Sequence, residues 1–205
     1  MSATHWEGPP LEAWDAWRPE AAAERLAGLA APWCVVGGWA IDLWLGEETR
    51  AHGDLEIAVV EADFPAVRRA LAGYRLFLPM DGSVRALADN AAPPADCHQT
   101  WVMEEAAQAW RLDVFREPGD ARTWVYRRDP SLTRPRAEME GRTTGGIRFL
   151  RPEGVLFYKA KATRPKDEAD FTVAAPRMDG GARAWLRAAL ERFHPGHAWI
   201  ARLGV

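Results

Sequence analysis

Gly37-Gly38-Trp39-Ala40-Ile41-Asp42 opens the most informative part of this chain, which continues with Arg50-Ala51-His52-Gly53-Asp54-Leu55-Glu56-Ile57-Ala58-Val59. The glycine pair follows a short apolar run and precedes an apolar segment, which predicts a strand, a tight turn and a helix. The second stretch predicts a strand over about 53–60. Because side chains alternate across a strand, Asp54 and Glu56 are expected to project from the same face.

These two acids predict a metal site, because neighbouring carboxylates repel each other and hard oxygen ligands favour Mg²⁺ or Mn²⁺. A further strand is expected over 109–116, where Asp113 faces away from its apolar neighbours. If that strand lies beside the strand at 53–60, Asp113 joins Asp54 and Glu56. Three carboxylates can hold two Mg²⁺ ions, and one of them can accept a proton from an attacking hydroxyl. The alternative for Asp113 is an ordinary solvent-facing strand acid.

The glycine pair predicts a phosphate site. Gly37 and Gly38 lack Cβ, so a phosphate can approach the backbone, and the following helix N-terminus offers free N–H groups and partial positive charge. A plain turn explains a lone glycine pair equally well. The acidic strand that follows gives the phosphate interpretation its weight.

The rest of the chain predicts an α+β fold, with a mixed sheet domain over residues 1–150 and a helical subdomain over 151–205. Helices are expected over about 10–30, from the glycine pair to near Gly46, and from Glu61 to about Gly73. Further strands are expected at about 75–79, 83–88, 98–103, 109–116, 124–126 and 145–150. The last helices are expected to begin at Pro152 and near Lys166, and to cover about 182–193.

Composition excludes several classes of protein. The net charge of −3 and the pI near 6.0 give no basic surface for nucleic acid, but suit a cationic small molecule. Cys34 and Cys97 are far apart and lack CxxC spacing, which argues against a disulfide framework or a zinc site. No apolar run reaches the ~18 residues of a membrane span and no signal pattern begins the chain, so a cytoplasmic location is expected.

Together, the glycine pair, Asp54, Glu56 and Asp113 resemble the motifs of the small nucleotidyltransferases of the DNA polymerase β superfamily, and most of all the aminoglycoside nucleotidyltransferases. The resemblance is specific over 33–60 and weaker around 109–116 and 150–172. It implies a nucleotidyltransferase-like mixed sheet flanked by helices. It also implies that Asp54 and Glu56 bind metal and that Asp113 is a metal ligand or the general base. Glu56 is a departure, because better characterised drug-modifying members carry Asp there.

Basic residues downstream are candidates for binding the triphosphate. The segment 159–170 concentrates four cations within eight residues, and Lys159 or Lys166 could reach a phosphate. The alternative is a solvated helix face whose cations form salt bridges with its acids. Arg50 is either a phosphate contact or a surface residue, and His52 either orients a carboxylate, contacts phosphate or caps the loop.

The function expected from the resemblance is Mg²⁺-dependent transfer of a nucleoside monophosphate, AMP from ATP in the first instance, to a hydroxyl of a small polar acceptor. An aminoglycoside-like acceptor fits the resemblance and the acidic site. Two alternatives stay open: an antitoxin-type enzyme that modifies a partner protein, and a catalytically inactive nucleotide-binding or partner-binding module. The short helical tail is compatible with a site completed by a homodimer.

Overall fold

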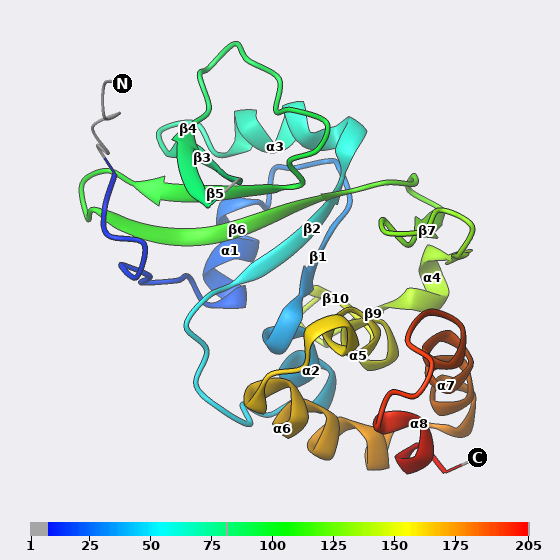
Figure 1. The fold of residues 1–205 in the computed structure, drawn as a ribbon. Coiled ribbons are helices and arrows are strands. Elements are labelled where there is room, and N and C mark those ends of the chain that lie inside the picture. The colour runs from blue at the N-terminus through cyan, green and yellow to red at the C-terminus, as the bar shows by residue number, and fades with distance from the viewer. Residues whose placement is uncertain (1–7, 81, 205) are drawn as a thin grey trace.

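The structure is a computed structural model that describes residues 8–80 and 82–204, and its centre is an eight-stranded mixed sheet (Figure 1). The strand order is β4-β3-β5-β6-β2-β1-β10-β9. The strands of this sheet are β1 (Trp33–Val36), β2 (Glu56–Val60), β3 (Arg75–Met80), β4 (Ser83–Ala86), β5 (Gln99–Glu104), β6 (Ala109–Glu117), β9 (Glu140–Arg142) and β10 (Arg148–Leu150). A separate two-stranded sheet pairs β7 (Thr123–Val125) with β8 (Thr133–Pro135).

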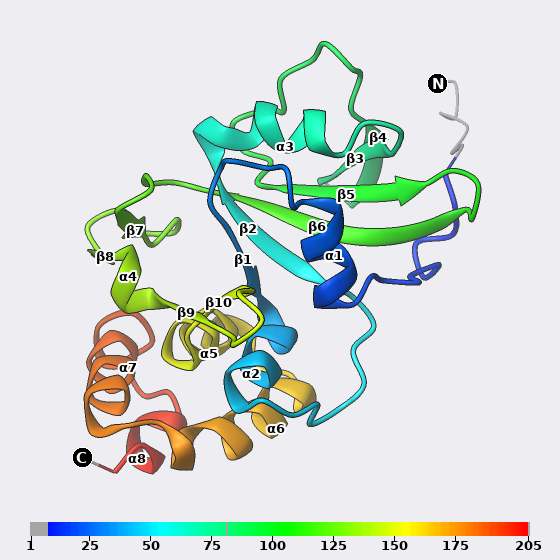
Figure 2. The same ribbon diagram turned by 180° about the vertical axis from the view of Figure 1, so that it is seen from behind.

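Most of the helices, including those of the C-terminal part of the chain, gather below the sheet in Figure 1. The helices are α1 (Pro19–Arg25), α2 (Gly37–Leu45), α3 (Phe64–Ala70), α4 (Arg136–Met139), α5 (Pro152–Lys159), α6 (Pro165–Ala174), α7 (Gly180–Phe193) and α8 (Trp199–Arg202). The described residues also form three 3₁₀ turns: η1 (Glu61–Asp63) before α3, η2 (Ala160–Ala162) between α5 and α6, and η3 (Ala175–Arg177) between α6 and α7. Figure 2 shows α1 lying across β2 and β6 on the rear face. The predicted α+β fold with a mixed sheet is confirmed, whereas a separate subdomain over 151–205 stays a prediction.

The strand–turn–helix predicted around the glycine pair is present. Val36 ends β1 in extended conformation, Gly37 has φ +66° and α2 begins there. Gly46 closes α2 in the left-handed conformation, with its N–H donated to the Asp42 carbonyl. Both glycines occupy positive φ, which residues with a Cβ rarely adopt.

The centre of the sheet separates an apolar face from a polar one. β2 runs antiparallel to β1 and parallel to β6, with Glu56 paired with Asp113 in the register. Ile57 and Val114 alternate with these acids, and both are fully buried on the opposite face. Burial of that face fixes the register, because a slip of one residue would turn the acids into the core.

The N-terminal helix is shorter than predicted, and the expectation of a helix over 10–30 was wrong. Residues 13–17 run alongside the beginning of β6: the Trp17 N–H donates to the Arg111 carbonyl, and Trp14 forms a bridge with Trp110. Arg18 is extended (φ −77°, ψ 158°), as a residue before proline tends to be, and the helix begins at Pro19. Backbone pairing with β6 therefore replaces the first half of the expected helix.

The shortest elements were not predicted from the sequence. β8, β9, α4 and α8 span three or four residues each, too few to show a period. The C-terminal helices α5, α6 and α7 begin close to the predicted positions. In the described ranges no helix combines the length and the apolar character needed to span a bilayer.

Candidate active site

Three predicted acids meet where β2 and β6 begin their parallel pairing. The Asp113 N–H donates to the Leu55 carbonyl at 2.9 Å, which places Asp113 beside Glu56. Asp54 precedes β2 by two residues. Burial first, and then the charge of Asp54, raises the pKa of Glu56. The structure therefore brings Asp54, Glu56 and Asp113 together, although no three His, Cys, Asp or Glu side chains of residues 8–80 and 82–204 are already arranged around one metal position.

The two carboxylate oxygens of Asp113 differ. Oδ2 accepts hydrogen bonds from Gln99 Nε2 at 2.8 Å and from Trp101 Nε1 at 3.2 Å. Oδ1 is buried and has no hydrogen-bond partner among the described residues. Burial, followed by the charge of Glu56, raises the pKa of Asp113 well above its usual value. One oxygen is therefore held in place while the other is available to a cation or a proton, which fits the metal site that the acids predict.

The glycine pair is needed for side chains of the site itself. A Cβ on Gly37 would overlap Glu56 Oε2, so the Glu56 carboxylate lies directly against the start of α2. A Cβ on Gly38 would overlap the guanidinium of Arg50 and the ring of His52. The sequence identified the turn correctly but not these contacts. Whether phosphate also approaches the turn stays a prediction.

Arg50 and His52 belong to a buried network that joins α2 to α6. His52 Nε2 lies 2.6 Å from Asp42 Oδ2, and Arg50 Nη1 lies 3.1 Å from His52 Nδ1. The arginine N–H requires an acceptor at Nδ1, which assigns the proton of a neutral ring to Nε2. Arg50 also forms a bidentate pair with Asp170, at 2.8 and 3.1 Å. Neither residue is a surface side chain, and the capping role considered for His52 is replaced by a bond to Asp42.

Asp42 is the member of this network that sequence reasoning missed. Its other oxygen accepts from Thr49 Oγ1 at 2.6 Å, and the residue is only 4% exposed. An acid in the middle of the apolar helix 37–45 was the available signal, because a buried carboxylate needs partners. Gln99 and Trp101 gave no comparable signal, since their role depends on the pairing of β5 with β6.

Lys159 forms salt bridges with neighbouring acids, as the alternative to phosphate binding predicts, but its side chain is largely buried and does not lie on a solvated helix face. Its Nζ contacts Asp167 Oδ1 at 2.7 Å and Asp170 Oδ2 at 3.1 Å, and its side chain is 9% exposed. Lys166 is exposed. The charges of Lys159, Lys166 and Arg164 oppose the rise of the Glu56 pKa that burial and Asp54 cause. The cations predicted to bind phosphate therefore act on the predicted metal site.

A cavity of about 340 Å³ lies between the polar face of the sheet and α5. Gly37, Glu56 and Lys159 line it at one end, whereas Asp54 and Asp113 are not among its lining residues. Farther along β6, Glu117 and Tyr158 line the same cavity. The cavity therefore extends from Glu56 toward Glu117, away from Asp54 and Asp113.

Sequence comparison assigns the family. A model of the aminoglycoside-2''-adenylyltransferase family matches residues 20–172, most of the chain. The chain belongs to this family. It is a nucleotidyltransferase, as the motifs predicted, and the match includes the glycine turn, the three acids and Lys159. No curated protein matches the chain.

Solved structures of adenylyltransferases have a similar fold. The solution structure of the antibiotic-resistance factor ANT(2'')-Ia is 19% identical over 85% of this chain and 88% of that chain, with a TM-score of 0.52. ANT(2'')-Ia in complex with adenylyl-2''-tobramycin is 18% identical over 85% and 94%, with a TM-score of 0.52. The lincomycin-bound lincosamide adenylyltransferase LnuA is 15% identical over 75% and 91%, with a TM-score of 0.51. These likenesses place the aminoglycoside-2''-adenylyltransferase family member in the nucleotidyltransferase fold.

Proposed function

We propose that this protein transfers AMP from ATP to a hydroxyl of a small polar acceptor, releases pyrophosphate and depends on Mg²⁺. The observation that carries the proposal is that Oδ1 of Asp113, beside Glu56, is buried and has no hydrogen-bond partner within residues 8–80 and 82–204. A nucleotidyltransferase needs acids at this place to hold divalent metal and to accept the proton of the attacking hydroxyl.

The roles follow from the surroundings of each acid. Asp54 and Glu56, with Asp113, would hold the metal, which neutralises the triphosphate and stabilises charge on the attacking and leaving oxygens when bound. The acceptor oxygen forms a bond to the α-phosphorus, and the bond from that phosphorus to the β-phosphate oxygen breaks. Asp113 Oδ1 takes the hydroxyl proton. Gln99 and Trp101 hold the other oxygen and so fix the direction of Oδ1.

Glu56 suits its position despite its length. Glutamate has one methylene more than the aspartate of the better characterised members, and its Oε2 lies where a Cβ of Gly37 would be. The absence of that Cβ gives the longer side chain its space. This arrangement supports an active rather than an inactive family member.

The triphosphate is proposed to lie at the start of α2. Gly37 and Lys159 line the Glu56 end of the cavity, and the charges of Lys159 and Lys166 both act on Glu56. The start of α2 would offer N–H groups to the triphosphate, and the two lysines would offer positive charge. Arg50 and His52 are proposed to support this turn from beneath, because both pack against Gly38.

The acceptor is proposed to be a hydroxyl-bearing antibiotic of the kind bound by the structural neighbours, an aminoglycoside first. The support is the family match, together with the tobramycin product on ANT(2'')-Ia and the lincomycin on LnuA. Partner proteins and nucleic acid have no comparable support.

Release of pyrophosphate from ATP tests the proposal, with tobramycin and lincomycin as first acceptors and Mg²⁺ or EDTA present. We expect acceptor-dependent release that EDTA abolishes and that Asp113→Asn lowers at least 100-fold, the scale of general-base catalysis. Asp89→Asn changes an exposed acid between β4 and β5 that does not line the cavity; it is the matched control and should retain full activity. Equal rates in wild type and Asp113→Asn would exclude the proposed role of Asp113.

A further inference from the structure

Glu117 is a buried acid that the proposed chemistry does not use. It is 8% exposed and lies four residues after Asp113 on β6, so alternation places both on the same face. The rise of a strand separates their Cα atoms by about 13 Å, roughly the length of an extended nucleoside monophosphate. Glu117 also lines the cavity that Glu56 borders.

The carboxylate of Glu117 retains capacity to accept hydrogen bonds. Tyr158 donates its hydroxyl to Oε2 at 3.3 Å, and Arg127 donates Nε–H to Oε1 at 3.5 Å. Both contacts are long, and a carboxylate has about four lone-pair sites. Burial and the neighbouring Glu117 raise the pKa of Tyr158, so its hydroxyl keeps the proton that it donates. Glu117 is therefore an acceptor that faces a cavity with unused lone pairs.

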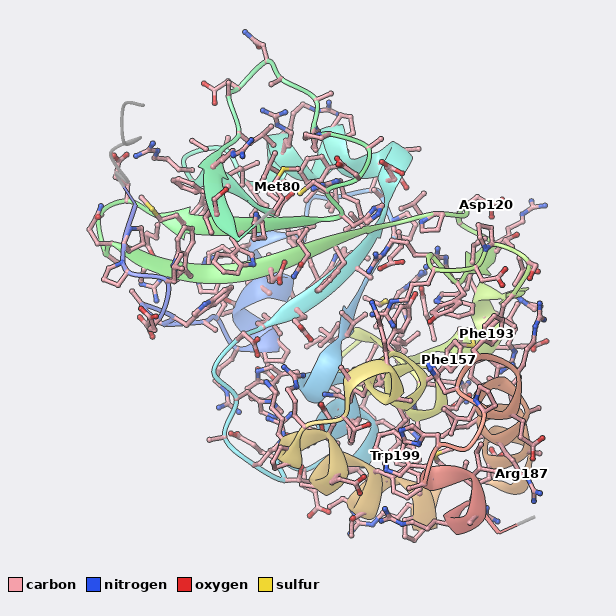
Figure 3. The ribbon with its side chains drawn as sticks, viewed as in Figure 1. Met80, Asp120, Phe157, Arg187, Phe193 and Trp199 are labelled. Carbon is pink, nitrogen blue, oxygen red and sulfur yellow. The ribbon has the colours of Figure 1, made fainter. Side chains whose placement is uncertain are left out.

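Apolar side chains lie on two sides of the cavity that Glu117 lines. Ala58 and Phe115 come from the sheet, and Val155 and the Tyr158 ring come from α5 on the other side. Tyr158 is held by Trp124 and Tyr126, with ring centroids at 6.2 and 5.4 Å. The preceding residue, Phe157, anchors α5 against Phe193 of α7 at 5.6 Å (Figure 3). Packing on both sides makes this wall rigid.

The charges that line the cavity favour an anionic ligand over a polycation. Three acids line it: Glu56, Glu117 and Asp167. Six cations line it: Arg127, Arg128, Arg136, Lys159, Lys161 and Arg164. This excess of positive charge would repel a multiply charged amine. It would attract the triphosphate of a nucleotide, and the neutral base attached to the triphosphate would not be repelled.

We propose that the Glu117 end of the cavity is the base subsite for the nucleotide. The purine ring lies between the apolar walls, and the Glu117 carboxylate accepts a hydrogen bond from the 6-amino group of adenine. Glu117 thereby selects ATP against purine nucleotides that carry oxygen or hydrogen at position 6. This inference rests on the proposed function, because it needs the triphosphate at the Gly37 end.

Binding of three nucleotides in Mg²⁺ tests the subsite. Calorimetry compares ATP with ITP, whose base carries oxygen at position 6, and with purine riboside triphosphate, which carries hydrogen there. We expect wild type to bind ATP about tenfold more tightly than either analogue, the scale of one hydrogen bond to a charged group. Glu117→Gln should reduce the ATP-to-ITP ratio about tenfold, because the amide can donate to the oxygen of ITP. Glu105→Gln, an exposed acid outside the cavity lining, should keep the wild-type ratio.

The outcomes separate the two proposals. Mg²⁺-dependent binding of all three nucleotides with equal affinity would overturn the subsite and leave the proposed function standing. A folded Glu117→Gln protein that keeps the wild-type preference would overturn the role of Glu117. Failure of every nucleotide to bind wild type would overturn the proposed function itself. If Glu117→Gln does not fold, which its melting curve reveals, the three nucleotides on wild type decide the question alone.

Discussion

The two oxygens of Asp113 have opposite surroundings, and this difference defines the site at the scale of single residues. Gln99 and Trp101 hold Oδ2, while Oδ1 is buried without a partner among the described residues. A buried acceptor left unsatisfied costs stability. The protein maintains this cost next to a second acid, Glu56, and we attribute it to the metal and the proton that Oδ1 would receive during the reaction.

The acids make a prediction about pH and stability. Burial raises the pKa of Asp113 and of Glu56; the charge of Glu56 adds to the rise at Asp113, and the charge of Asp54 adds to the rise at Glu56. The folded chain therefore binds protons at these groups more readily than the unfolded chain. Their contribution to stability is complete below the ordinary carboxyl pKa of about 4 and is lost as pH rises through the raised values. In EDTA, we expect the melting temperature of wild type to fall in this range more steeply than that of Asp113→Asn. Identical pH profiles for the two proteins would contradict the proposed electrostatics.

At the scale of elements, the turn between β1 and α2 depends on small residues for packing against the site. Gly38→Ala places a methyl group against Arg50 and His52, and overpacking typically costs about 1–3 kcal/mol. Gly28→Ala is the matched control, because its Cβ would meet open space. Denaturant unfolding should show a lower free energy of unfolding for Gly38→Ala and little change for Gly28→Ala. Equal stabilities would show that the turn tolerates a side chain.

The elements also show what the sequence could and could not predict. The turn, α2 and the strands that carry Glu56 and Asp113 followed from glycine placement and strand alternation, which are local signals. The bond from Arg50 to Asp170 joins residues 120 positions apart, and no local pattern encodes it. The hydrogen bond from Tyr158 of α5 to Glu117 of β6 likewise joins residues 41 positions apart, so no local pattern predicts the surroundings of Glu117. The first half of the expected N-terminal helix is absent, because residues 13–17 form backbone hydrogen bonds with β6 despite the helical spacing of their apolar side chains.

At the scale of the whole molecule, buried charges tie the C-terminal helices to the sheet side of the site. Asp170 of α6 forms ion pairs with Arg50, which lies between α2 and β2, and with Lys159, the last residue of α5. The Asp170 side chain is 2% exposed. Hydrogen bonds and ion pairs from these cations, against the opposing effect of burial, lower the pKa of Asp170. Arg50 packs against Gly38 of the glycine turn, and Lys159 lines the cavity at the predicted phosphate position. These charges therefore contribute both to the stability of the fold and to the site.

Removing Asp170 tests this link. Asp170→Ala removes the carboxylate that pairs with Arg50 and one of the two carboxylates that pair with Lys159. Breaking a buried pair costs about 3–5 kcal/mol. The exposed pair of Glu47 with Arg177, which also joins the end of α2 to the C-terminal helices, supplies the control. Glu47→Ala should cost at most about 1 kcal/mol. Similar losses of unfolding free energy in the two variants would show that the buried network has no special weight.

The central claim is that Asp54, Glu56 and Asp113 form a metal-dependent nucleotide site. Calorimetric titration of ATP into wild type and Asp54→Asn, first with Mg²⁺ and then with EDTA, tests it most directly. We predict binding to wild type in Mg²⁺ that EDTA removes and that Asp54→Asn weakens strongly, with the melting temperature of the variant unchanged. Absence of ATP binding to wild type in Mg²⁺, or binding that neither EDTA nor Asp54→Asn affects, would contradict the claim.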